Sequence, residues 1–318
     1  MADTPKIFAA LADPTRLRIL MLLRAMELSV GEIAQVLGQS QPRVSRHVKI
    51  LIDASLAERR KEGSWVFLSL GPKARLEPLF QLLDRWEDLD GARESTMADG
   101  ARLAAVRADR AAAAERYFDQ HAKDWDALRS LHVAESEVEA AIGRALADVD
   151  IGRLVDIGTG TGRMIELFGR EAERALGIDR SPEMLRLARV KLSQAGLESV
   201  ELRQGDIYAL ALPSACAETV IIHQVLHYAQ NPAAAVAEAA RLLTPGGRLL
   251  IVDFAPHERE ELRVSDAHAR LGFADEAVLN YMEEAGLQGR VFEHLEGGPL
   301  TVTLWLGEQP SEKLKVVA

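Results

Sequence analysis

Residues 153–163, RLVDIGTGTGR, constrain the fold of this chain most, because they join an apolar run to a glycine-rich loop. The apolar run predicts a buried strand that ends at Ile157. Gly158, Gly160 and Gly162 allow a sharp turn and a close approach of the backbone to a ligand. From Arg153 onward, apolar runs alternate with amphipathic helical stretches, which is typical of a parallel sheet with helical crossovers. We therefore predict an α/β domain with a mostly parallel sheet and a ligand site at this loop.

The spacing of the loop favours one nucleotide cofactor over another. A dinucleotide fingerprint counted from Gly158 would need glycine at position 163, where Arg163 stands. Asp156 would repel a pyrophosphate but tolerates a zwitterionic methionine moiety with a cationic sulfonium. The next expected strand ends in Asp179, 23 residues after Asp156, where a carboxylate can accept hydrogen bonds from both ribose hydroxyls. These features predict S-adenosylmethionine rather than NAD.

Further motifs follow in a fixed order: QGDIYAL at 204–210, TVIIHQVLHY at 219–228 and LLTPGGRLLIVDF at 242–254. With the glycine loop, they make residues 115–307 resemble the class I small-molecule S-adenosylmethionine methyltransferases, including the ubiquinone-biosynthesis type. The resemblance implies a Rossmann-like fold, with Asp179 on the ribose, Asp206 near the adenine and His223 to Leu226 beneath the cofactor. The expected cofactor-binding residues are Asp156, Gly158, Thr159, Gly160, Gly162, Asp179, Arg180, Met184, Gly205, Asp206, Ile207, His223 and Gln224.

The residues for catalysis are less clearly marked, because methyl transfer from a sulfonium depends mainly on alignment. His223, His227 and Tyr228 are the catalytic candidates, and Asp253 is expected near the methyl group. Three residues that precede the expected strand at 153–157 could cover the site: Tyr117, His121 and Trp125. His223 and His227 are four apart, but without a nearby carboxylate trio we expect polar site residues and no metal. The residues do not distinguish a domain that transfers methyl groups from one that only binds S-adenosylmethionine or S-adenosylhomocysteine.

The first 70 residues carry a different pattern, that of a helix-turn-helix. Asp13 before Pro14 predicts the N-cap of one helix, and Ser29 with Glu32 forms a capping-box pattern for the next. That helix should end at Gly38, and a third should start near residue 40 with one apolar face. The stretches AERRKEG and SWVFLSL then predict a β-hairpin wing.

Charge is segregated between the two halves. The net charge of the chain is −10, which by itself argues against nucleic acid. Residues 1–70, however, hold ten Lys/Arg and seven Asp/Glu, whereas the remaining residues hold 28 and 41. Six basic residues fall within residues 40–61 against Asp53 and Glu58, a cluster typical of a DNA-facing edge.

Residues 5–70, with LADPTRLRILMLL, SVGEIAQVLGQSQPRVSRHVKILIDASL and the wing, resemble winged-helix repressors of the ArsR type. The resemblance implies that the third helix enters the major groove of operator DNA. Packing and a phosphate contact remain equally open for His47. The predicted DNA-binding residues are Ser40, Gln41, Arg43, Ser45, Arg46, His47, Lys49, Arg59, Arg60 and Lys61.

One departure from that family concerns the signal. Many members sense metals through cysteine pairs before the recognition helix, where this chain has Leu28, Ser29, Val30 and Gly31. Its single cysteine, Cys216, also excludes an internal disulfide, and we interpret it as a small loop residue. No thiolate site is therefore expected, and the cofactor domain is the candidate receiver of a signal.

The predicted organisation has four parts: a winged helix at 1–71, a helical connector or dimerisation region at 72–131, the S-adenosylmethionine-binding domain at 132–307 and a polar tail at 308–318. The sequence has no apolar run long enough for a membrane span and no signal-peptide pattern, so we expect a cytoplasmic protein. The helix-turn-helix leads us to expect a homodimer. The leading hypothesis is a transcriptional regulator with a methyltransferase domain whose S-adenosyl ligand modulates DNA binding. The alternatives are a non-catalytic ligand-sensing repressor and a small-molecule methyltransferase whose winged helix is only an interaction module.

Overall fold

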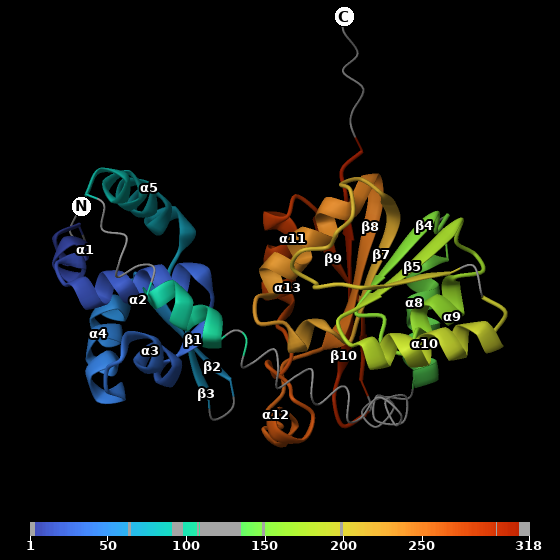
Figure 1. The fold of residues 1–318 in the computed structure, drawn as a ribbon, viewed down its shortest axis with the longest axis horizontal. Helices are drawn as coiled ribbons and strands as arrows, with labels where there is room; N and C mark the ends of the chain where they lie inside the picture. The colour runs from blue at the N-terminus through green and yellow to red at the C-terminus, as the bar shows by residue number, and fades with distance from the viewer. Residues whose placement is uncertain are drawn as a thin grey trace, which may run out of the picture. The chain divides into compact units, whose positions relative to one another are not determined.

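A computed structural model describes residues 4–62, 65–90, 98–106, 108, 135–147, 150–197, 200–296 and 298–311. The chain divides into two units, Met1–Ala112 and Ala113–Ala318. Figure 1 draws both units; among the described residues, the N-terminal unit has one hydrophobic core, and the C-terminal unit has two. None of the described helices combines the length and the apolar character needed to span a bilayer.

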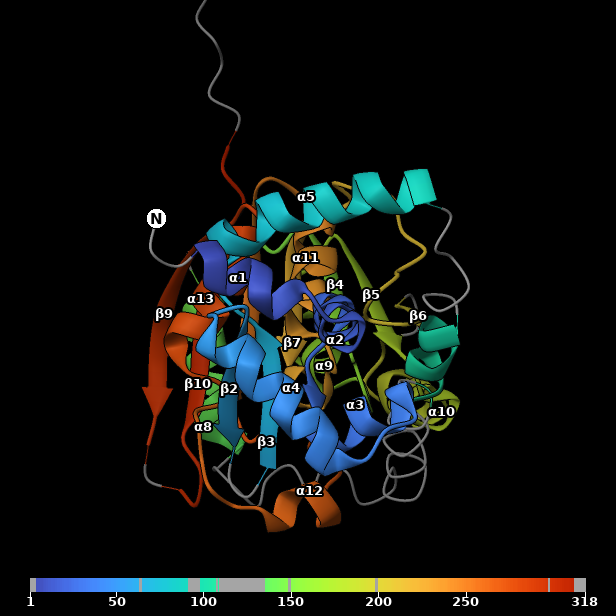
Figure 2. The same cartoon turned by 90° about the vertical axis from the view of Figure 1, so that its left-hand side faces the viewer.

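The N-terminal unit is a winged helix-turn-helix. Its elements are α1 (Thr4–Leu11), α2 (Pro14–Ala25), β1 (Leu28–Ser29), α3 (Val30–Leu37), α4 (Gln41–Asp53), β2 (Ala57–Glu62), β3 (Trp65–Leu70) and α5 (Lys73–Asp90). The strands form an antiparallel sheet in the order β1-β3-β2, and the hairpin β2–β3 lies beside α4 (Figure 2).

Local signals set the helix ends in this unit. Asp13 accepts a hydrogen bond from the Arg16 amide at 3.1 Å and caps α2. Ser29 and Glu32 form a complete capping box on α3, and Gly38 ends it in the left-handed conformation with φ 64°. The helix-turn-helix and wing expected from the sequence are thus confirmed, whereas α1 and β1 were not foreseen.

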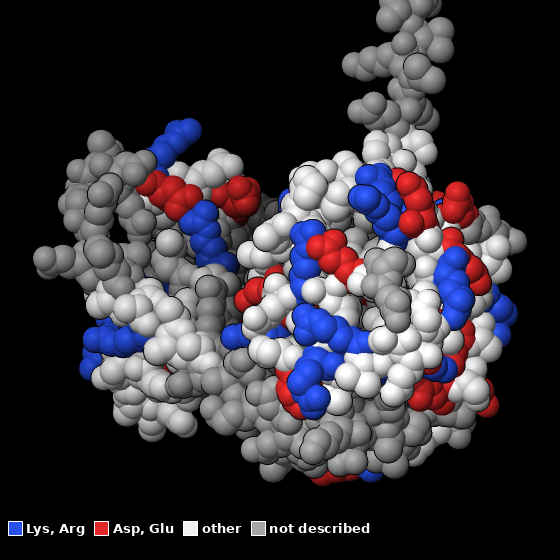
Figure 3. Space-filling view, turned by 45° about the vertical axis from the view of Figure 1, so that its right-hand side comes forward, with Lys and Arg blue, Asp and Glu red and all other residues white. Residues whose placement is uncertain are grey.

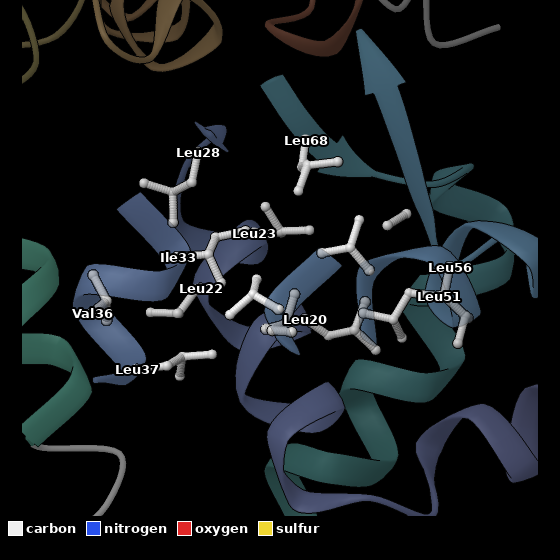
Figure 4. Close-up of a cluster of buried hydrophobic side chains, with 14 of the residues drawn as sticks. Leu20, Leu22, Leu23, Leu28, Ile33, Val36, Leu37, Leu51, Leu56 and Leu68 are labelled. Atoms are coloured by element: carbon white, nitrogen blue, oxygen red, sulfur yellow. The ribbon is translucent and has the colours of Figure 1, made fainter. Parts of the chain in front are cut away.

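Leucines from every layer of the N-terminal unit meet in one core, where Leu20 of α2, Leu28 of β1, Leu51 of α4 and Leu68 of β3 are fully buried (Figure 4). Leu76 and Phe80 of α5 and Leu103 and Val106 of the helical residues 98–106 join the same core. Part of the segment expected to be a connector therefore packs within the N-terminal unit.

The C-terminal unit is a three-layer α/β domain around a seven-stranded sheet of the described residues, in the order β6-β5-β4-β7-β8-β10-β9. Its strands are β4 (Arg153–Ile157), β5 (Arg174–Asp179), β6 (Glu201–Gln204), β7 (Ala217–His223), β8 (Leu243–Phe254), β9 (Gln288–Leu295) and β10 (Val302–Glu308). β4 to β8 run parallel, and β10 is antiparallel to both neighbours. The mostly parallel sheet is confirmed.

Helices cover both faces of this sheet (Figure 1). The described helices of this unit are α8 (Glu135–Leu146), α9 (Arg163–Phe168), α10 (Pro182–Gln194), the 3-10 turn η2 (Leu226–Tyr228), α11 (Pro232–Leu242), α12 (Glu261–Ser265) and α13 (Asp275–Glu284). Side chains alternate along each strand, so Leu250 and Val252 of β8 join the core with α8, α9 and α10, whereas Leu249 and Ile251 join the core with α11 and α13.

Candidate functional site

The glycine loop after β4 is a left-handed turn folded against the end of β5. Gly158, Gly160 and Gly162 have φ values of 74°, 52° and 87°. The amides of Gly158 and Thr159 donate to the Ile178 carbonyl at 2.7 and 2.9 Å. A Cβ at Gly158 would overlap the methyl groups of Val225. Glycine is therefore required there both by the backbone conformation and by the segment after β7.

Asp179 ties this loop to the end of β5. One carboxylate oxygen accepts a hydrogen bond from the Gly160 amide at 2.8 Å, and the other accepts one from the Ser181 amide at 2.9 Å. An ionised carboxylate offers about four lone-pair sites. A carboxylate is therefore an acceptor of the kind that ribose hydroxyls bind. The Asp179 carboxylate and the glycine loop beside it together fit an S-adenosyl ligand.

Asp156 is placed inside the protein. It is 1% exposed, and its Oδ2 accepts a hydrogen bond from the Thr159 hydroxyl at 2.6 Å. Asp156 therefore stabilises the glycine loop from the buried side, through its bond to Thr159.

The remaining predicted cofactor residues adjoin the ends of β5 and β6. The Gly205 amide donates to the Asp179 carbonyl at 3.0 Å. Asp206 is exposed, and its carboxylate accepts from the Tyr208 amide at 3.0 Å. The others differ in burial: Arg180 exposed, Ile207 half-buried and Met184 buried. Asp206 and Arg180 are thus accessible to a ligand, whereas Met184 belongs to the core.

His223 and Gln224 end β7 and are both buried, with 8% of each exposed. Gln224 has a φ of 52°, and its amide donates to the Val252 carbonyl at 2.7 Å. A left-handed backbone is costly for a residue with a side chain, and such strain is concentrated at functional sites. The strain falls one residue before Val225, which packs on the glycine loop.

The catalytic candidates His223, His227 and Tyr228 differ in their surroundings. His227 Nδ1 lies 2.8 Å from Asp253 Oδ1, and both side chains are almost fully buried. Asp253 also accepts hydrogen bonds from the amides of His227 and Phe254, at 3.1 and 2.7 Å. The Tyr228 ring centroid is 4.0 Å from that of His227. Within the described residues, no three His, Cys, Asp or Glu side chains gather as metal ligands would.

The sequence interpretation missed a histidine that packs on His227, a second histidine beside it, and the half-buried Tyr208. The His268 ring, from the segment 255–273 that follows β8, lies 4.2 Å from the His227 ring, and His257 lies 6.3 Å from His268. The Tyr208 hydroxyl accepts hydrogen bonds from the amides of Gln230 and Asn231, and burial raises the pKa of Tyr208. Only the histidines themselves, in a stretch without clear periodicity, could have indicated this segment. Tyr117, His121 and Trp125 lie outside the described residues.

The DNA-facing candidates on α4 form one exposed face. Val44, Val48 and Leu51 are buried beneath the helix. The opposite side is exposed at the N-cap and at five helix positions: Ser40, Gln41, Arg43, Ser45, Arg46 and Lys49. Half-buried His47 has its Nδ1 3.6 Å from a carboxylate oxygen of Asp13, the N-cap of α2. The helix therefore presents a polar and basic surface while His47 turns toward the protein.

The wing candidates lie on β2. Arg59 is exposed, and Arg60 and Lys61 follow it on the same strand. On the C-terminal unit, by contrast, acidic and basic side chains are intermixed over the face seen in Figure 3. Charge of one sign is thus concentrated on α4 rather than on that face.

Two family models match the chain. Residues 13–59 match the arsR family of bacterial regulatory proteins, and residues 155–251 match a methyltransferase domain. The arsenic resistance transcriptional regulator of Pseudomonas putida is 34% identical over 102 residues, which are 30% of this chain and 80% of that protein.

Two further relatives each match part of one of the two units of the chain. The arsenical resistance operon repressor of Escherichia coli is 44% identical over 68 residues, covering 21% of this chain and 58% of the repressor. Phosphatidylethanolamine N-methyltransferase of Cereibacter sphaeroides is 36% identical over 112 residues, covering 35% of this chain and 55% of the enzyme. The chain spans about half the length of several relatives that it matches. The chain therefore belongs to the arsR family of bacterial regulatory proteins through its N-terminal helix-turn-helix, and it joins a methyltransferase domain to it.

Proposed function

We propose that this chain is a DNA-binding transcriptional regulator whose C-terminal domain binds S-adenosylmethionine and whose DNA affinity depends on the S-adenosyl ligand. The bond between the Gly160 amide and the Asp179 carboxylate carries the cofactor assignment, because it joins the glycine loop and the ribose-binding candidate in one arrangement. The exposed basic face of α4 over a buried apolar face supports the DNA assignment.

For DNA, the residue types on α4 suit reading in the major groove. Arg43 and Arg46 can each form two hydrogen bonds to guanine, and Gln41 can do so to adenine. Lys49 and the wing residue Arg59 can neutralise phosphates. A homodimer would present two such helices about one DNA turn apart on a two-fold operator.

For the cofactor, S-adenosylmethionine supplies an activated methyl group on a cationic sulfur. The glycine loop would hold its methionine part, and Asp179 its ribose hydroxyls. Asp206 and Ile207 would bind the adenine, and His223 and Gln224 would lie beneath the ligand. S-adenosylhomocysteine, the product of transfer, would occupy the same residues and is the second candidate signal.

Two other functions compete with this proposal. A repressor that senses the ligand without catalysis would use the same binding residues, but the buried pair of His227 and Asp253 favours catalysis, because binding alone does not require it. A methyltransferase whose winged helix only contacts other proteins would not need Arg46 and Lys49 exposed on α4.

Calorimetry of the full chain with S-adenosylmethionine and S-adenosylhomocysteine, with and without DNA from upstream of its own gene, tests the proposal. We expect binding of both ligands, binding of the DNA, and a ligand affinity that changes when DNA is present. Absence of ligand binding would contradict the cofactor assignment, and absence of DNA binding would contradict the regulator assignment.

A further inference from the structure

The pair of His227 and Asp253 lies at the edge of the sheet where the glycine loop lies. β4, β7 and β8 are parallel, so their carboxyl ends share one edge, which is where ligands bind in open α/β sheets. His227 follows β7 by four residues, and Asp253 is the second-last residue of β8. Val225, between His223 and His227, packs directly on Gly158. The pair is therefore a neighbour of the proposed methionine-binding loop.

The two nitrogens of His227 have different environments. Nδ1 is bonded to Asp253, whereas Nε2 is closed off from solvent and has no hydrogen-bond partner among the residues that the structure describes. A bond from Nδ1–H to a carboxylate leaves Nε2 as a lone pair, since neutral imidazole carries one proton. A buried polar atom without a partner is costly and needs an explanation.

Packing around His227 is aromatic. The ring centroids of Tyr228, His268 and Phe254 lie 4.0, 4.2 and 5.1 Å from that of His227. These rings favour a flat, apolar ligand that carries one polar hydrogen.

The cysteine of the chain, Cys216, precedes β7 and so lies toward the opposite edge of the sheet. Thiol chemistry at this edge therefore has no protein thiol to support it.

A purely structural role does not account for the His227 side chain. The backbone carbonyl of His227 accepts hydrogen bonds from the amides of Ala269 and Arg270, at 3.1 and 3.0 Å, and so anchors the segment after α12. Any residue can supply that carbonyl. The Asp253 carboxylate contributes to this anchoring by accepting the His227 amide at 3.1 Å, which leaves the imidazole without a task in it.

We propose that His227 Nε2 is the proton acceptor for a methyl acceptor of the phenol class, with Asp253 as the positioning residue. In the transfer, the phenolic O–H bond breaks and its proton goes to Nε2. The oxygen forms a bond to the methyl carbon, and the electron pair of the broken carbon–sulfur bond stays on sulfur. Asp253 fixes the Nδ1–H tautomer and stabilises the imidazolium that results.

A phenol needs such a base, because its ordinary pKa of about 10 leaves it protonated and weakly nucleophilic at neutral pH. An amine acceptor would instead become a cationic methylated ammonium beside the imidazolium that forms. Because Nε2 is buried and the rings of Tyr228 and His268 pack on His227, the acceptor reaches it only after this packing opens. This inference rests on the proposed function and names the substrate class of the same site.

The test uses the full chain loaded with S-adenosylhomocysteine, so that no transfer occurs, and 4-nitrophenol, whose phenolate is coloured. At a pH below the pKa of the free phenol, we expect the wild type to bind the probe and to increase its phenolate band. His227→Gln should abolish that increase and weaken probe binding about 10- to 100-fold, as expected for a lost buried hydrogen bond. Asp253→Asn, which keeps the imidazole, should reduce the band. His294→Gln, on β9, should behave as the wild type.

Nitrogen-15 NMR of the histidine rings gives a readout that is independent of the probe. We expect the proton of neutral His227 on Nδ1, and an Nε2–H tautomer in the wild type would overturn the proposal. It is also overturned if His227→Gln retains the phenolate band, or if the loaded wild type does not bind the probe, which would leave a bound water as the partner of Nε2. Calorimetry of S-adenosylhomocysteine alone separates the two conclusions. Normal ligand binding without probe ionisation overturns the base, whereas absent ligand binding overturns the proposed function.

Discussion

The carboxylate of Asp179 accepts a 2.8 Å hydrogen bond from the amide of Gly160, which joins the end of β5 to the loop after β4. Removing the carboxylate should cost both this bond and the proposed bonds to the ribose. We expect Asp179→Ala to weaken S-adenosylmethionine binding about 10- to 100-fold, the range for hydrogen bonds to a charged group.

Calorimetry checks this expectation, with Glu201→Ala as the matched control. Glu201 is an exposed carboxylate on the neighbouring β6, paired with Arg203. Its removal should leave ligand affinity unchanged. Wild-type affinity in the Asp179 variant, or tight binding of NADH by the wild type, would contradict the cofactor assignment.

Arg46 is exposed on α4, where a base contact is expected. Losing one good base contact costs about 1–3 kcal/mol, so Arg46→Ala should weaken operator binding roughly 5- to 150-fold. Fluorescence anisotropy with operator DNA measures the change. Arg85→Ala removes an exposed arginine from α5 and should have little effect. Unchanged affinity of the Arg46 variant would show that another face of α4 meets the DNA.

The elements predicted correctly from the sequence were those fixed by short-range chemistry. The Ser29–Glu32 capping box and Gly38 set the ends of α3 through bonds between neighbouring residues. The pairing of His227 with Asp253 spans 26 residues and arises because β7 and β8 are adjacent in the sheet. Residue spacing alone does not give that adjacency. For the same reason, the pattern of α5 indicated an apolar face but not the N-terminal core that this face contacts.

Arg18 of α2 and Asp99 form a two-bond ion pair, with both nitrogen–oxygen distances 2.6 Å, that fastens residues 98–106 to the N-terminal core. Asp99 is 5% exposed, and its bonding raises the pKa of Arg18. Asp99→Asn should lower the free energy of unfolding by about 1–3 kcal/mol, because it leaves a partly buried charge without its counter-charge. Chemical denaturation checks this. Asp84→Asn breaks an exposed pair with Arg24 and should have the smaller effect; equal effects would contradict the interpretation.

Glu218 should make the C-terminal unit sensitive to acid. Hydrogen bonds from Arg153 lower the pKa of Glu218 from 4.5 to about 2. A depressed pKa adds stability above the ordinary value, and this stability is lost as the pH falls from about 4.5 toward about 2. The pair is partly exposed, so its contribution is about 1 kcal/mol or less. Urea unfolding near pH 7 and near pH 4 should show that the free energy of unfolding falls less on acidification in Glu218→Gln than in the wild type. An equal fall in both proteins would mean that another group causes the acid sensitivity.

The last prediction concerns coupling between the two units. We expect an S-adenosyl ligand to change operator affinity, because residues 28–31 contain no cysteine for a thiolate metal site, which leaves the cofactor domain as the candidate receiver of a signal. A typical coupling is about 1–3 kcal/mol, or roughly 5- to 150-fold in affinity. Operator titrations without ligand, with S-adenosylmethionine and with S-adenosylhomocysteine measure it.

Thermodynamic linkage makes this coupling testable from both sides. If the ligand weakens operator binding by some factor, the operator must weaken ligand binding by the same factor. Asp179→Ala should abolish the ligand effect while leaving operator affinity without ligand unchanged, because Asp179 lies in the C-terminal unit. A ligand effect that persists at full size in this variant would place the signal outside the glycine-loop site. Identical operator curves under all three conditions would mean that the two units work independently on one chain.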